Sequence, residues 1–125
     1  MKLRADQNKD INLITGYQAD HVLINKLRQD GNLVVLADRI ETGWAPGGFE
    51  GLAPEDFAAL AALGVEIVLI GTGRRQRFPN PALLRPLMEA RIGFEVMDLP
   101  AACRTYNILA AEGRAVAAAL LFDPA

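Results

Sequence analysis

Short apolar runs separated by polar residues fill the first third of the chain. They occupy residues 11–17, 21–25, 33–37 and 40–44. Each run has the length and residue types of a β-strand, and the Asp-Gly-Asn sequence at 30–32 is typical of a turn. We therefore expect a hairpin followed by a meander of short antiparallel strands.

From residue 54 onward, helical spacing of apolar residues alternates with fully apolar runs. Pro54, Glu55 and Asp56 suit the first turn of a helix, and Gly64 suits its end. The run at 65–70 is apolar apart from one glutamate, as expected of a strand covered on both faces. This part of the chain predicts a helix followed by a buried strand.

A second helix is predicted to begin at Asn80 and Pro81 and to reach about Ile92, with Gly93 as its stop. Pro86 lies inside this span. Because proline lacks a backbone N–H, we expect it to kink the helix or delay its start.

The last quarter predicts a strand at 94–97, a helix capped by Asp98 and reaching Glu112, and a final strand at 116–122. Strands followed by alternating helices and strands define an α/β domain around a mixed sheet. We expect a single domain over residues 1–125.

Composition limits the functional classes. The 125 residues include 13 basic and 15 acidic side chains, a net charge of -2, which makes nucleic acid an unlikely partner. Cys103 is the single cysteine, so the chain forms no internal disulfide, as is common in the cytoplasm. The first ten residues have no signal-peptide pattern. The apolar run at 115–122 is too short to span a bilayer, so no membrane insertion is expected.

The sequence predicts no metal site and no cofactor, because His21 is the single histidine and no paired ligands occur at metal spacing. Cys103 and His21 are far apart along the chain, and Cys103 lies on the apolar stripe of its predicted helix. We therefore interpret Cys103 as a core residue rather than a nucleophile. Whether the protein is an enzyme stays open, with a non-catalytic role favoured.

One candidate ligand site follows the buried strand. Backbone amides of glycine-rich turns at such strand ends can bind anions, and arginines follow directly. Asn107 and Tyr106, polar residues inside an alanine-rich helix, are candidates to orient the ligand, although they could equally satisfy backbone groups of a neighbouring loop. The candidate ligand-binding residues are Gly71, Thr72, Gly73, Arg74, Arg75, Tyr106 and Asn107. A tight turn with a solvated basic loop is the simpler interpretation.

A second candidate is a protein-interaction surface. Aromatic residues in and beside a glycine-rich loop often anchor protein contacts, although a tryptophan at a strand end also commonly closes a core. The residues proposed for this surface are Trp44, Phe49, Arg75, Arg77 and Phe78.

Three segments carry a family resemblance: VLIGTG at 68–73, GFEVMD at 93–98 and, above all, AACRTYNIL at 101–109 with Glu112 and Arg114. They resemble domain-of-unknown-function family 498, which includes a mitochondrial complex I assembly factor and an adipogenesis-associated protein. The resemblance implies a three-layer α/β domain with a mixed central sheet and a small additional antiparallel β-layer. It implies no catalytic residues.

The resemblance favours a non-catalytic domain that binds protein partners as an accessory in complex assembly. Without a mitochondrial leader, the chain looks like a free-standing bacterial, cytoplasmic member of the family. The alternative is a small anionic-ligand-binding domain, or an enzyme, with its pocket at the Gly71-Thr72-Gly73 turn.

Overall fold

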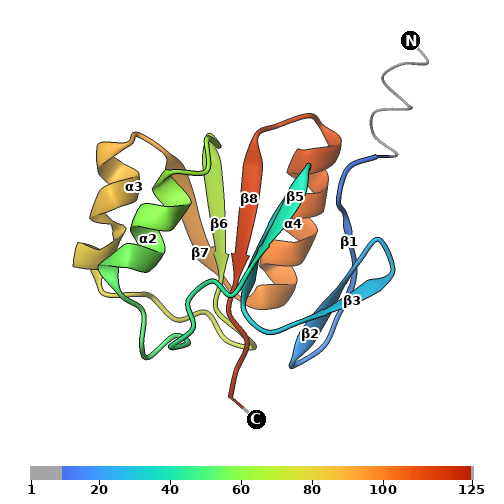
Figure 1. Cartoon of the computed structure of the whole chain (residues 1–125), viewed down its shortest axis with the longest axis horizontal. Coiled ribbons are helices and arrows are strands. Elements are labelled where there is room, and N and C mark those ends of the chain that lie inside the picture. The colour runs from blue at the N-terminus through green and yellow to red at the C-terminus, as the bar shows by residue number, and fades with distance from the viewer. Residues whose placement is uncertain (1–9, 125) are drawn as a thin grey trace.

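A five-stranded mixed sheet forms the middle layer of the fold (Figure 1). The computed structural model describes residues 10–124, so the polar N-terminal segment at 1–9, and with it most of the signal-peptide interpretation, lies outside the described residues. The strand order is β5-β4-β8-β6-β7, in which β8 runs parallel to β6 and antiparallel to β4. The strands are β4 (Leu33–Leu36), β5 (Arg39–Thr42), β6 (Ile67–Gly71), β7 (Gly93–Met97) and β8 (Val116–Leu120).

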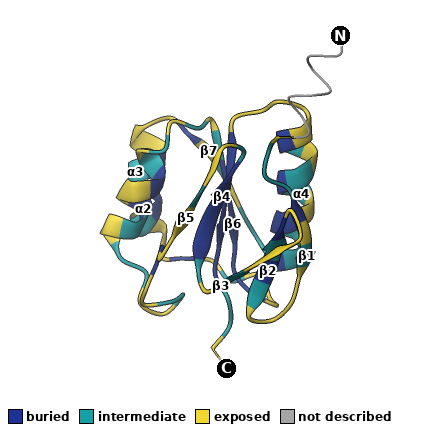
Figure 2. Ribbon diagram, turned by 45° about the vertical axis from the view of Figure 1, so that its right-hand side comes forward, coloured by how far each residue is buried: buried dark blue, intermediate teal, exposed yellow. Residues whose placement is uncertain are grey.

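The two faces of this sheet are covered differently. Helices α2 (Pro54–Ala61) and α3 (Arg85–Glu89) lie on one face, and α4 (Leu99–Ala111) lies on the other, as Figures 1 and 2 show. A small antiparallel sheet of β1 (Ile14–Tyr17), β2 (His21–Ile24) and β3 (Leu27–Asp30) packs on the α4 side. The expected three-layer α/β fold is confirmed.

Residue type explains why β4 and β8 occupy the middle of the sheet. Every residue of both strands is buried, and the sequences are LVVL and VAAAL. Strands covered on both faces need apolar side chains throughout. The three alanines of β8 add little bulk, so the helices on both faces can approach its backbone closely.

The meander predicted for the first third is divided between two sheets. β1, β2 and β3 form the small sheet, whereas β4 and β5 belong to the large one. The change of sheet falls at the Gly31-Asn32 turn, where the Asn32 side chain donates to the Ala45 carbonyl and accepts from the Phe122 amide. These two hydrogen bonds connect the turn to segments of the large sheet.

The predicted second helix is shorter than expected. A 3-10 turn η1 (Pro81–Leu84) precedes α3, and the Asn80 side chain accepts from the Ala82 amide at its start. α3 ends at Glu89 rather than near Ile92. Pro86 is the physical reason for the late start, because proline fits the first turn of a helix but not its interior.

Cys103 lies in the core between α4 and the sheet and is 1% exposed. Burial raises the pKa of its thiol to about 12, only partly offset by the charge of Arg104. We expect the folded protein to react with a disulfide reagent at pH 8 at least about 100-fold more slowly than the protein unfolded in guanidinium, since the reactive thiolate is scarce and shielded. Stopped-flow absorbance measures this ratio, and equal rates would contradict the burial of Cys103.

Within residues 10–124, we find no helix with the length and apolar character needed to cross a bilayer.

Candidate functional site

The carboxyl ends of β6, β7 and β8 meet at one edge of the large sheet, where the Gly71-Thr72-Gly73 turn leaves β6. All three residues of the turn are buried. The Thr72 amide donates to the Met97 carbonyl at 2.9 Å, and the Leu99 amide donates to the Gly73 carbonyl at 2.7 Å. The turn is therefore attached to both the end of β7 and the start of α4.

Thr72 organises the segment that follows, residues 74–78, which we call the arginine loop. Its hydroxyl donates to the Arg75 carbonyl at 2.7 Å and accepts from the Arg77 amide at 2.8 Å. The Arg77 guanidinium in turn donates to the Thr72 carbonyl at 2.8 Å. A buried hydroxyl that is used as both donor and acceptor fixes the loop in one conformation.

Asp123, which follows β8, occupies the position where a bound anion was expected. Its carboxylate accepts hydrogen bonds from the Arg74 amide and Arg74 Nε, both at 3.1 Å, and from Arg77 Nη2 at 3.1 Å. Burial alone would raise the pKa of Asp123, but the hydrogen bonds from Arg74 and the charges of Arg77 and Arg74 outweigh it, so the pKa lies below its usual value. The chain thus supplies its own anion to this site.

Asp123→Asn is expected to lower the free energy of unfolding at pH 7 by about 1–3 kcal/mol, since hydrogen bonds to a charged group are lost. The native pKa of Asp123 lies below the unfolded value, so its contribution is present above about pH 4 and is lost as pH falls through the native pKa. Urea unfolding of both proteins between pH 2 and pH 7 should show the difference shrinking with acid. Glu95→Gln, at an exposed carboxylate on β7, is the control. A pH-independent difference would contradict the ion-pair role.

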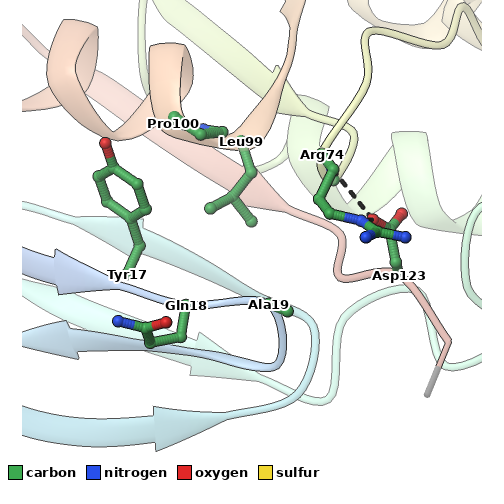
Figure 3. A pocket seen from close by; sticks show the side chains of 8 residues that line it. Tyr17, Gln18, Ala19, Arg74, Leu99, Pro100 and Asp123 are labelled. Atoms are coloured by element: carbon green, nitrogen blue, oxygen red, sulfur yellow. Dashed lines mark hydrogen bonds and ion pairs between the residues drawn. The ribbon is translucent and has the colours of Figure 1, made fainter.

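A cavity of about 250 Å³ lies beside the turn. Figure 3 shows Tyr17 and Gln18 on one side of it, Leu99 and Pro100 from the start of α4 on another, and the Arg74–Asp123 ion pair at its far end. It is lined by Tyr17, Gln18, Ala19, Gly73, Arg74, Leu99, Pro100 and Asp123. Of these residues, sequence reasoning named only Gly73 and Arg74, because the β1–β2 turn and the tail after β8 are far from them along the chain.

Tyr106 and Asn107, the other candidate ligand residues, do not line this cavity. The Tyr106 hydroxyl donates to the Asn12 carbonyl at 2.8 Å. The Asn107 amide donates to the Ile14 carbonyl and its oxygen accepts from the Ile14 amide, both at 2.8 Å. Both side chains therefore satisfy backbone groups of β1 and the segment before it.

The burial of Tyr106 changes the acidity of its hydroxyl. The side chain is fully buried, and this desolvation, together with the charge of Asp38, raises the pKa of Tyr106 well above its usual value. The neutral hydroxyl is the form that can donate to Asn12, so burial and the hydrogen bond favour the same protonation state.

The residues predicted to form an interaction surface fall into two groups. Trp44 is 7% exposed, donates from Nε1 to the Asp56 carbonyl and contacts Phe57 edge-on, so it closes the core under α2. Phe49 is half-buried beneath the Arg77 guanidinium, whose central carbon lies 4.4 Å from the ring centroid.

Arg75 and Phe78 form the exposed group. Arg75 is exposed, and Phe78 is 70% exposed. Both belong to the arginine loop, so this group presents a positive charge and an aromatic ring from one short segment.

The small sheet brings together three groups that sequence spacing did not reveal. Asp20, His21 and Asp30 have ligand-type atoms within 4.8 Å of one another, because β2 and β3 pair His21 with Asp30. The hydrogen bond from His21 lowers the pKa of Asp20. Arg28 forms ion pairs with both carboxylates, at 3.6 Å and 2.9 Å, so the acidic charge is compensated within the chain.

The architecture and the turn define a class of α/β proteins in which an arginine-containing loop follows a buried Gly-Thr-Gly strand end. The chain belongs to the family described as protein of unknown function DUF498/DUF598, whose profile matches residues 14–121. It is 34% identical over 113 residues to the Bos taurus protein named NADH dehydrogenase (ubiquinone) 1 alpha subcomplex assembly factor 3. That alignment covers 89% of this chain and 61% of the relative, so the chain spans about three fifths of the relative's length.

Bacterial proteins are similar as well. A crystal structure of a Bordetella parapertussis protein superimposes with a TM-score of 0.78 at 36% identity, covering 90% of this chain and 97% of that one. A Francisella tularensis relative named 13 kDa major membrane protein is 34% identical over 62 residues, half of each chain. The names of these similar proteins therefore differ in the location they suggest.

Proposed function

We propose that residues 1–125 act as one cytoplasmic protein-interaction domain that assists the assembly of a protein complex. The Bos taurus relative carries the name of an assembly factor for NADH dehydrogenase, which supports this class of function. The proposal assigns the contact to the arginine loop, with Arg75 and Phe78 as its exposed side chains.

The observation that carries the proposal is the exposure of Phe78 on a loop held in one conformation. Its ring is 70% exposed, while the loop is held by Thr72 and Asp123 through five hydrogen bonds described above. Large exposed aromatic side chains are common anchors at protein interfaces. A loop fixed before binding loses little conformational entropy when a partner docks.

Arg75 supports the same assignment. Its side chain is exposed beside Phe78, and arginine, like the aromatic residues, is enriched at interfaces. A partner covering both residues would bury an aromatic ring next to a charge that can pair with a carboxylate, a combination that gives both affinity and specificity.

The experiment is affinity capture of the tagged protein from its own cells, analysed for proteins and small molecules. Wild type is compared with an Arg75→Glu, Phe78→Ser double variant. Arg85→Glu with Met88→Ser is the matched control, because it changes an exposed arginine and a 55% exposed apolar residue on α3. Circular dichroism confirms that all three proteins fold.

We expect a stoichiometric protein that co-purifies with wild type and the α3 control and is lost from the arginine-loop variant. A partner retained equally by all three proteins would overturn the assignment of the loop. Capture of a small anion with no protein would favour the second candidate below.

The second candidate function is binding of a small anionic ligand at the Gly71-Thr72-Gly73 turn. One amide and two guanidinium groups already converge on the Asp123 carboxylate, which demonstrates the chemistry such a ligand would use. A free anion would have to displace Asp123. We expect phosphate to shift the Arg74 amide resonance of an Asp123→Asn variant and not of Asp123→Asn, Arg77→Gln. Absence of any phosphate-dependent shift would remove this candidate.

A further inference from the structure

The cavity beside Gly73 differs in character from the arginine loop. Its walls are the Tyr17 ring, Ala19, Leu99 and Pro100, and its charged groups, Arg74 and Asp123, lie together at one end (Figure 3). The cavity therefore offers an apolar compartment with a charged end, built from the β1–β2 turn, the start of α4 and the arginine loop.

The size of the cavity restricts what can occupy it. Its volume of about 250 Å³ is below the roughly 300–1,000 Å³ of sites that enclose drug-sized ligands. A single apolar or aromatic side chain, inserted from a partner, is a better match than a cofactor. Single anchors of this kind, held in a pocket at the centre of a contact, supply much of the affinity of protein interfaces.

The charge at the end of the cavity selects the neighbours of that anchor. Arg74, Arg75 and Arg77 contribute three positive charges, and Asp123 compensates one of them. Arg74 is 81% exposed despite its ion pair, so its guanidinium also faces solvent. The whole chain has a net charge of -2, and this end of the molecule is therefore locally opposite in sign to the rest.

We propose that the cavity binds a short segment of a partner protein in which one apolar or aromatic residue is followed or preceded by acidic residues. The apolar side chain enters between Tyr17 and Leu99, and an adjacent carboxylate pairs with Arg74. This inference rests on the proposed function and names the kind of segment that the domain recognises.

The electrostatic part of the proposal has a distinctive signature. Arg74→Gln removes the charge that attracts the acidic residues, so affinity falls. Asp123→Asn removes the internal carboxylate that competes for the same guanidinium, so affinity rises. We expect changes of about two- to fivefold in opposite directions, the size expected for an exposed ion pair. Structural disturbance of the loop would weaken binding in both variants.

The test begins with selection of random nine-residue peptides on the wild-type protein from a displayed library. We expect the selected peptides to share one apolar or aromatic position with at least one acidic residue within two positions. Dissociation constants of the consensus peptide, and of versions with alanine at the anchor or lysine for the acidic residues, are then measured by NMR titration.

Ala19→Trp is the variant that fills the cavity, because Ala19 lines it and is exposed on the β1–β2 turn. Ala82→Trp, at an exposed alanine on η1, is the matched control. We expect Ala19→Trp to weaken binding of the consensus peptide at least about tenfold and the control to leave it unchanged. The amide resonances of Gly73 and Ala19 should shift on binding to wild type.

Selection of peptides without acidic residues, selection of none, or binding insensitive to Ala19→Trp would overturn this inference. So would parallel weakening by Arg74→Gln and Asp123→Asn. These failures are separate from failure of the proposed function: a cellular partner lost from the Arg75, Phe78 variant but retained by Ala19→Trp would uphold the arginine loop and exclude the cavity.

Discussion

Asn107→Leu is expected to lower the free energy of unfolding by about 2–5 kcal/mol. The Asn107 amide replaces a neighbouring strand at the edge of β1, since it bonds both backbone groups of Ile14, a residue that is 5% exposed. Leucine would leave the N–H and the C=O of Ile14 without partners, and each unpaired buried group costs about 1–3 kcal/mol.

Urea unfolding measures the loss, and hydrogen exchange of the Ile14 amide reports its location. Thr105→Ala, two positions earlier on α4, is the control and should be neutral or slightly stabilising because alanine is a better helix former. A loss below about 0.5 kcal/mol, or unchanged protection of the Ile14 amide, would show that Asn107 does not hold β1.

Gly71→Ala is expected to lower the free energy of unfolding by about 1–3 kcal/mol through overpacking. A Cβ atom at Gly71 would lie 2.9 Å from the Ala102 Cβ, 3.1 Å from Leu120 Cδ2 and 3.3 Å from the Leu99 Cα. The contacts with Ala102 and Leu99 involve α4 itself, so the helix would have to move away from the sheet.

Gly93→Ala is the matched control, because a Cβ there would meet only the Glu66 carbonyl oxygen, at an ordinary 3.5 Å. A double-mutant cycle with Ala102→Gly tests the mechanism: the second substitution removes the clashing methyl group, so the combined loss should be smaller than the sum of the single losses. Additive losses would show that the packing of Gly71 on α4 is not the cause.

The sequence predicted the elements whose pattern is set by burial or by capping. β4, β6 and β8 are apolar along their length, and Asp98 caps α4 by accepting from the Ala101 amide, as expected. These features are local, so residue type alone determines them.

The strand β3 was not predicted, because its residues, LRQD, are mostly polar and exposed. Leu27 is 67% exposed, so no alternation of buried and exposed positions marks the strand. Its existence depends on pairing with β2 through a tight turn in which Asn25 and Lys26 both have positive φ. Pairing of this kind is a property of two segments together and is weakly encoded in either one.

The candidate site was predicted in part. Position after a buried strand identified the Gly71-Thr72-Gly73 turn and the arginines, but Asp123 is 49 residues from Arg74 and carries no motif. Helical spacing identified Tyr106 and Asn107 as unusual without indicating their partners, which lie more than 90 residues earlier in the chain. Sequence patterns locate polar residues that need partners, whereas tertiary structure decides which partners they have.

The central position of β8 has a consequence for synthesis on the ribosome. β4 and β6 both pair with β8 and not with each other, so the large sheet stays in two pieces until residues 116–120 are available. Most of β8's pairing partners have left the exit tunnel well before β8 itself does. The nascent chain therefore exposes the unpaired edges of two half-sheets until late in translation, a period in which chaperones have the greatest access to them.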